Sequence, residues 1–218
     1  MSAWWHDDPC EDKPGNSGNG HSNGNGNGHH DHGNGNGYGH DHCVPCFASG
    51  TLLQLANGSL KAVDNIGEGD ILRTFGGDDR RVLWAGGSIE TEETYRIIDS
   101  RKGSATVVTK NHGIAVRLLD GSGALAPAKF LTESLYGDFM VVPEEGDVAV
   151  RHIMLEDHAL LIANGGLVSE SYYCGGYSTL PDAQAAYTSA TGMEEMELVL
   201  PRLRRRDVPE VFEIVRAA

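Results

Sequence analysis

The sequence is poor in cysteine and in long apolar runs. Only 4 of its 218 residues are cysteine, too few for a disulfide scaffold in a chain of this length. No stretch approaches the roughly 18 consecutive apolar residues that a membrane-spanning helix requires. The first residues lack the basic and apolar regions of a Sec signal peptide. We therefore expect no membrane-spanning segment, and a protein that is cytoplasmic or exported by a non-Sec route.

Positive charge is also scarce. The chain has 17 Lys and Arg against 31 Asp and Glu, which gives a formal net charge of -14. A surface of that sign repels nucleic-acid phosphates and anionic lipids. Neither a nucleic acid nor a membrane is expected as a partner.

The N-terminal part has almost no apolar residues. Residues 15–39 are nearly all Gly, Asn, His and Ser, so burial cannot offset the roughly 1–2 kcal/mol of backbone entropy that ordering each residue costs. We predict a flexible low-complexity tail over residues 1–42, a folded domain over 43–175 and a partly helical C-terminal extension over 176–218.

This tail carries seven of the ten histidines. Clustered imidazoles bind zinc, nickel or copper, so one hypothesis is a metal-binding tail and the other is a solvated spacer. The candidate zinc or nickel ligands are His29, His30, His32, His40 and His42. Cys43 and Cys46 form a separate Cys-x-x-Cys pair, which suits a redox disulfide or half of a zinc site.

The rest of the chain is predicted to form short strands separated by turns. Asn-Gly pairs at 57–58 and 164–165 predict two tight hairpins. Strands are predicted at 51–55, 60–63, 71–74, 80–84, 95–99, 105–109, 114–118, 139–142, 148–155, 159–163 and 167–169. Such spacing indicates an all-β fold. Helices are expected only near the end, at 181–187 and around 194–206.

Three motifs occur in a characteristic order. Cys46 stands where the low-complexity tail gives way to the first strand, and Thr109 and His112 form a Thr-x-x-His motif at the end of a later strand. Residues 155–169 form a strand, an Asn-Gly turn and a second strand. Together they resemble the Hint domain family, the fold shared by inteins and the autoprocessing part of hedgehog proteins. The resemblance spans residue 46 to about 173 and is greatest to the bacterial hedgehog/intein-like group that lacks the C-terminal splicing residues.

A cysteine at this position has a specific chemistry open to it. Its thiol can attack the preceding carbonyl, that of Pro45, and convert the peptide bond into a thioester by an N-to-S acyl shift. The reaction needs a polarised carbonyl, a stabilised oxyanion and a proton for the departing nitrogen. His112 suits the proton transfer, and the Thr109 hydroxyl can orient the peptide.

Two further histidines come from the closing strands of the expected fold. The resemblance places His152 about where inteins have a catalytic aspartate, which implies a supporting acid-base role. His158 is expected to be structural.

The closing residues depart from the intein pattern. Inteins end with His-Asn followed by Cys, Ser or Thr, whereas Ser169, Glu170 and Ser171 stand here. Glutamate has no amide nitrogen with which to cyclise, so splicing is not expected. The resemblance then implies a single-turnover, cofactor-independent cleavage of the chain's own N-terminal segment, with water, a thiol or an amine as acceptor. No sterol adduct is expected.

Two observations argue against cleavage. Pro45 is a poor acyl group because its ring hinders attack and restricts distortion of the bond, and the released segment would be a polar tail with no obvious use. The alternative is a catalytically silent Hint scaffold with a His-rich metal-binding tail.

Overall fold

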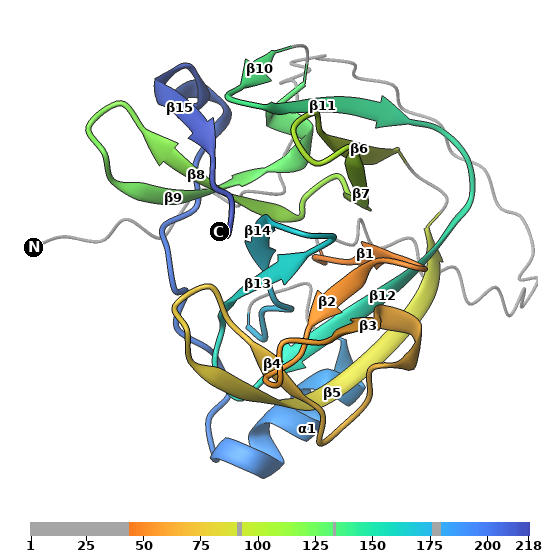
Figure 1. Cartoon of the computed structure of the whole chain (residues 1–218). Coiled ribbons are helices and arrows are strands. Elements are labelled where there is room, and N and C mark those ends of the chain that lie inside the picture. The colour runs from red at the N-terminus through yellow and green to blue at the C-terminus, as the bar shows by residue number, and fades with distance from the viewer. Residues whose placement is uncertain (1–43, 91–92, 133, 176–179) are drawn as a thin grey trace, which may run out of the picture. The chain divides into compact units, whose positions relative to one another are not determined.

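A computed structural model describes residues 44–90, 93–132, 134–175 and 180–218, which belong to one compact unit. The fold is all-β, as predicted, with two antiparallel sheets (Figure 1). None of the helices in this described part is long and apolar enough to cross a membrane.

The first sheet carries the residues of the candidate site. Its strand order is β10-β11-β6-β7-β1-β12-β5-β4. The bounds are β10 Leu135–Tyr136, β11 Phe139–Glu144, β6 Thr94–Asp99, β7 Ser104–Thr109, β1 Phe47–Ala48, β12 Val148–Leu155, β5 Asp79–Glu90 and β4 Ile71–Arg73.

The second sheet has the order β15-β8-β14-β13-β2-β3, with β9 paired to β8. The bounds are β15 Val211–Ile214, β8 Gly113–Leu118, β14 Leu167–Glu170, β13 Leu160–Ala163, β2 Leu52–Gln54, β3 Leu60–Ala62 and β9 Gly123–Pro127. Short 3-10 helices span Val63–Asn65, Ala128–Phe130 and Arg205–Glu210.

Both predicted Asn-Gly hairpins are present. Gly58 adopts φ +84° between β2 and β3, and Asn164 and Gly165 adopt φ +42° and +84° between β13 and β14. Residues in this left-handed region match the twist of two antiparallel strands, and Asn and Gly tolerate it best. The turns therefore fix the pairing of both hairpins.

Alternation along the strands separates two of the three apolar clusters found among the described residues. Phe47 points into the large core with Val108 and Ile153. Its neighbour Cys46 points the other way, into a second cluster with Val150, because successive strand residues face opposite sides. The helix α1, Pro181–Thr191, packs its buried Ala183 and Tyr187 into this second cluster.

The predicted second helix around residues 194–206 is wrong. This segment has no α-helix, and its backbone pairs with β9 instead: Leu125 donates to Pro201 O (2.8 Å) and Leu203 donates to Leu125 O (2.8 Å). Proline lacks an amide hydrogen and disrupts a helix interior. The chain then adds β15 to the edge of the second sheet.

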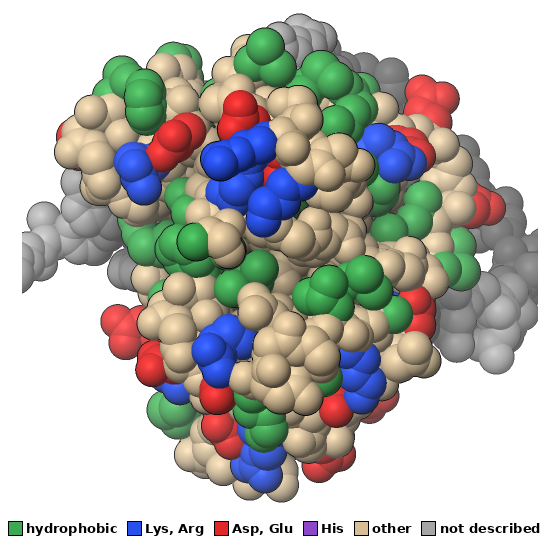
Figure 2. Space-filling view, in the orientation of Figure 1, with side chains coloured by type: hydrophobic (Ala, Val, Ile, Leu, Met, Phe, Trp, Pro, Cys, Tyr) green, Lys and Arg blue, Asp and Glu red, His purple; other side chains and the backbone are tan. Residues whose placement is uncertain are grey.

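Charged side chains on the surface are largely paired. On the face drawn in Figure 2, most Lys and Arg side chains lie beside Asp and Glu side chains. Exposed ion pairs among the described residues include Arg117 with Glu213 (2.9 Å) and Arg81 with Glu156 (2.9 Å). Exposed pairs of this kind each contribute little to stability.

Candidate active site

Three candidate residues lie in one row across adjacent strands. In the antiparallel register, Phe47 of β1 faces Val108 of β7 and Arg151 of β12. One residue further along each strand, Cys46 therefore lies between Thr109 and His152. Side chains of directly opposed residues project from the same face, so the fold brings these three together.

The Cys46 thiol contacts an imidazole. Its Sγ lies 2.9 Å from His152 Nδ1 and 3.3 Å from the carbonyl oxygen of Val44. The same Nδ1 lies 3.4 Å from the carbonyl oxygen of Pro45. Cys46 is only 1% exposed. His152 thus touches both the thiol and the carbonyl that the thiol would attack.

Thr109 binds the peptides around Pro45. Its hydroxyl oxygen accepts the Cys46 N–H at 3.2 Å, and its hydroxyl donates to Val44 O at 3.0 Å. The Thr109 N–H donates to Cys46 O at 3.2 Å. These bonds fix the nitrogen of the Pro45–Cys46 bond.

His112 lies in the turn that follows β7. Its Nδ1 is 3.0 Å from Cys46 O, and since a carbonyl only accepts, Nδ1 carries the hydrogen. Burial lowers the pKa of His112 to about 4, so the ring is neutral at pH 7. The buried Nε2 has no hydrogen-bond partner among the described residues. Sequence analysis expected His112 to transfer a proton to the departing nitrogen of Cys46. The structure places the His112 ring beside the carbonyl oxygen of Cys46 instead.

The buried neutral state of His112 predicts an acid-sensitive fold. Its pKa is lowered from 6.5 to about 4, so between these values the unfolded chain binds a proton that the folded protein does not. The free energy of unfolding should then fall by about 3 kcal/mol as the pH drops through this window. Urea unfolding at pH 7 and pH 4.5 should show that His112→Asn loses less stability on acidification than the wild type. Equal losses would contradict this assignment.

Aromatic rings surround His152. Trp84 stacks on it at 5.9 Å between ring centroids, and Tyr172 meets it edge-on at 5.7 Å. The register partner of His152 is Gly86, where a Cβ would lie 2.3 Å from the Trp84 ring. The glycine leaves space for the indole. Sequence analysis did not identify Trp84 or Gly86 as part of the site, because a Trp-x-Gly pattern in a strand is a weak signal.

His158 lies in a buried polar cluster behind the site. Its Nδ1 accepts the Val199 N–H at 3.2 Å, and its Nε2 lies 3.2 Å from Glu170 Oε2. Burial alone would raise the pKa of Glu170, but Arg202 and His158 outweigh it and hold the pKa at about 2.

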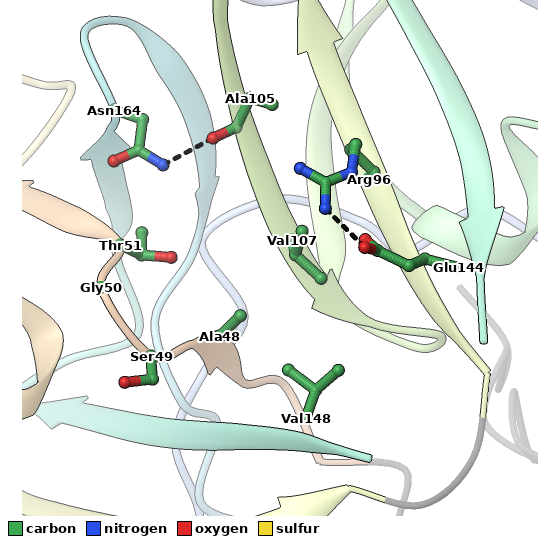
Figure 3. A pocket seen from close by; sticks show the side chains of 10 residues that line it. All are labelled: Ala48, Ser49, Gly50, Thr51, Arg96, Ala105, Val107, Glu144, Val148 and Asn164. Atoms are coloured by element: carbon green, nitrogen blue, oxygen red, sulfur yellow. Dashed lines mark hydrogen bonds and ion pairs between the residues drawn. The ribbon is translucent and has the colours of Figure 1, made fainter. Parts of the chain in front are cut away.

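A pocket of about 370 Å³ opens on the same face of the sheet (Figure 3). Ala48, Val107 and Val148 line it, and each lies an even number of residues along its strand from Cys46, Thr109 or His152. Side chains two residues apart share a face. Arg96 pairs with Glu144 at one side of this pocket.

The predicted metal ligands lie outside the described residues. They are His29, His30, His32, His40 and His42, and Cys43 also falls there. In the part of the chain that the structure does describe, no group of three or more His, Cys, Asp or Glu side chains could hold a metal ion.

The structure is thus an all-β domain in which a buried cysteine, just before the first strand, is hydrogen-bonded by Thr109 and His112 of a Thr-x-x-His turn. Residues 45–176 match the family model described as Hint domain. The chain belongs to the Hint domain family. Among curated proteins there is no match.

Several solved structures are similar to this chain. One is a bacterial intein-like domain from Clostridium thermocellum, with 18% identity over 58% of this chain and 97% of that chain, and a TM-score of 0.44. Another is a DnaB intein from Synechocystis sp. PCC 6803, with 13% identity over 58% and 98% and a TM-score of 0.43. The TvoVMA intein has 15% identity over 58% and 96% and a TM-score of 0.47.

Proposed function

We propose that this Hint domain cleaves its own chain before Cys46, through a thioester. The observation that carries the proposal is the position of the Cys46 thiol, 2.9 Å from His152 Nδ1 and next to a peptide bond whose nitrogen is held by Thr109. Membership of the Hint family supports self-processing in general.

In the first step the thiol proton passes to His152 Nδ1, and Sγ attacks the carbonyl carbon of Pro45. A bond forms between Sγ and that carbon. The protonated imidazole lies near the Pro45 oxygen (3.4 Å), where it stabilises the negative charge that develops. His152 thereby serves as base and as oxyanion donor.

In the second step the bond between the Pro45 carbon and the Cys46 nitrogen breaks. The proton taken from the thiol returns from His152 to this nitrogen, which leaves as an amine, so no external acid is consumed. Thr109 holds the nitrogen through its hydroxyl (3.2 Å). His112 holds the carbonyl of Cys46 (3.0 Å). This contact limits rotation of Cys46, whose sulfur and backbone nitrogen both react.

A small nucleophile then resolves the thioester and releases residues 1–45. Water, a thiol or an amine can do this chemically, with acyl transfer from sulfur to the acceptor and return of a proton to the Cys46 thiol. We infer that the acceptor approaches from the pocket beside Ala48, because that pocket lies on the reactive face, one side-chain row from Cys46.

Splicing is not part of the proposal. Glu170 has a carboxylate that is fully buried and ion-paired with Arg202. A carboxylate bound in this way has no nitrogen with which to attack the backbone. The C-terminal part of the chain should remain attached after cleavage.

The proline before the scissile bond should slow the first step. Its ring restricts the backbone and crowds the carbonyl, so Pro45→Ala should release residues 1–45 roughly tenfold faster, which corresponds to about 1.4 kcal/mol of barrier. The rates are compared by intact mass in a reducing thiol at pH 7. A rate equal to or below that of the wild type would show that proline does not limit the reaction.

A further inference from the structure

We propose that Arg202 is a positioning residue for the site, acting through Glu170 on the turn that carries His112. Arg202 lies outside the family match, which ends at residue 176. The inference rests on the proposed function for its effect on rate, but its structural part can be measured without cleavage.

The pair Arg202–Glu170 binds the chain on both sides of His112. Arg202 Nη2 donates to the carbonyl oxygen of Asn111 at 3.2 Å, and Glu170 Oε1 accepts the Gly113 N–H at 2.6 Å. Arg202 also pairs directly with Glu170 Oε1. One ion pair therefore ties down both residues that flank the imidazole.

The contact between Glu170 and Gly113 is so close that it leaves no room for a side chain at position 113. A Cβ at this position would lie 2.8 Å from the Glu170 carboxyl group, so the carboxylate sits directly against bare backbone. Glu170 is 0% exposed. A carboxylate buried to this extent requires a charged partner, and Arg202, with 16% of its side chain exposed, is that partner.

The second carboxylate oxygen is also occupied. The Val199 N–H donates to His158 Nδ1, so a neutral His158 carries its hydrogen on Nε2. That hydrogen points to Glu170 Oε2 at 3.2 Å. The segment from Val199 to Arg202 thus supports both carboxylate oxygens: Arg202 pairs with Oε1, and Val199 orients His158 toward Oε2.

The backbone of this segment is fixed where Arg202 leaves it. Pro201 O accepts the Leu125 N–H, and the Leu203 N–H donates to Leu125 O, both at 2.8 Å. Arg202 is thereby held in an isolated parallel bridge with Leu125 of β9. Its side chain needs little further ordering to reach Glu170, which favours precise positioning.

Loss of this arginine should loosen the turn and misplace His112. The Nδ1 hydrogen of His112 would then no longer be held on Cys46 O. A displacement of about 1 Å in a reactive arrangement can cost about a hundredfold in rate. We expect Arg202→Met, which keeps an apolar stem but no charge, to slow the release of residues 1–45 by about 10- to 100-fold.

The experiment uses the full chain and two readouts. One is the rate of release in hydroxylamine, by intact mass. The other is the tautomer and mobility of His112, from long-range proton–nitrogen correlation NMR of ¹⁵N-histidine-labelled protein. Arg206→Met is the matched control, because the Arg206 side chain is 68% exposed. Arg202→Lys should recover part of the rate, since it restores the charge but not the planar geometry of the guanidinium group.

Arg202→Met leaves the buried carboxylate with the Gly113 N–H and His158 but without its cationic partner, so the double variant Glu170→Gln/Arg202→Met, which removes both charges, is tested in parallel. The proposal expects both variants to fold, to lose the His112 Nδ1–H signal and to cleave slowly, while Arg206→Met stays within twofold of wild type.

A folded variant with the wild-type His112 signal overturns the proposal. Unfolding of both variants also overturns it, because that result would assign Arg202 a structural role only. If the wild type never cleaves, the proposed function fails, while the NMR comparison still decides whether Arg202 positions His112.

Discussion

Replacing Cys46 with alanine is expected to abolish release of residues 1–45 completely. The Cys46 sulfur forms the new bond to the Pro45 carbon. A water molecule that fills the space left by the missing thiol cannot form a thioester. Cys46→Ser should retain at most a slow ester-forming reaction, because a hydroxyl is a weaker nucleophile and is harder to deprotonate. The measurement is the full-length mass over several days in a reducing thiol.

Cys174 provides the matched control. It is also a buried thiol, and burial raises its pKa to about 11, but its Sγ lies against Gln184 Oε1 (3.4 Å) and not against a histidine. Cys174→Ala should cleave at the wild-type rate. Release that persists in Cys46→Ala would rule out the thioester.

Replacing His152 with glutamine is expected to slow release by about 10²- to 10⁴-fold, the range for loss of a general acid-base group. Glutamine retains hydrogen bonding but cannot take the thiol proton, and it cannot carry the positive charge that faces the Pro45 oxygen (3.4 Å). The rate is measured in hydroxylamine at pH 6 to 9. Because the base is then lost, the rate that remains should rise steadily with pH as solvent deprotonates the thiol.

His21→Gln carries the same substitution within the low-complexity segment and should leave the rate unchanged. Thermal unfolding of both variants shows whether the fold is retained. A folded His152→Gln protein that cleaves within about threefold of wild type would assign the proton transfer to another group. His112, whose Nε2 has no hydrogen-bond partner in the described part of the chain and whose pKa is about 4, would be the next residue to test.

The sequence predicted much of this arrangement because its signals are local. The Asn-Gly pairs specify their hairpins through backbone conformation, and alternation in the strands specifies which side of the sheet each residue faces. Cys46, Thr109 and His152 were all identified as candidates. Their common row, however, depends on the register of β1 with β7 and β12, which joins segments far apart in the chain.

Contacts made by the C-terminal segment could not be predicted in the same way. Its charged composition suggested a helix, but its backbone finds hydrogen-bond partners at Leu125, and tertiary pairing outweighs helix propensity. The ion pair of Arg202 with Glu170 has no sequence pattern at all. The partner of the His112 ring was also missed, because it depends on the shape of the turn between Thr109 and Gly113.

The most direct test of the account is the mass of the wild-type protein, measured when freshly made and after incubation with neutral hydroxylamine. Attack on the thioester should give two products: residues 1–45 ending in a hydroxamate on Pro45, and residues 46–218 with a free N-terminal cysteine. A full-length mass that never changes under these conditions would contradict cleavage at Cys46 and leave the domain as a folded Hint scaffold without this chemistry.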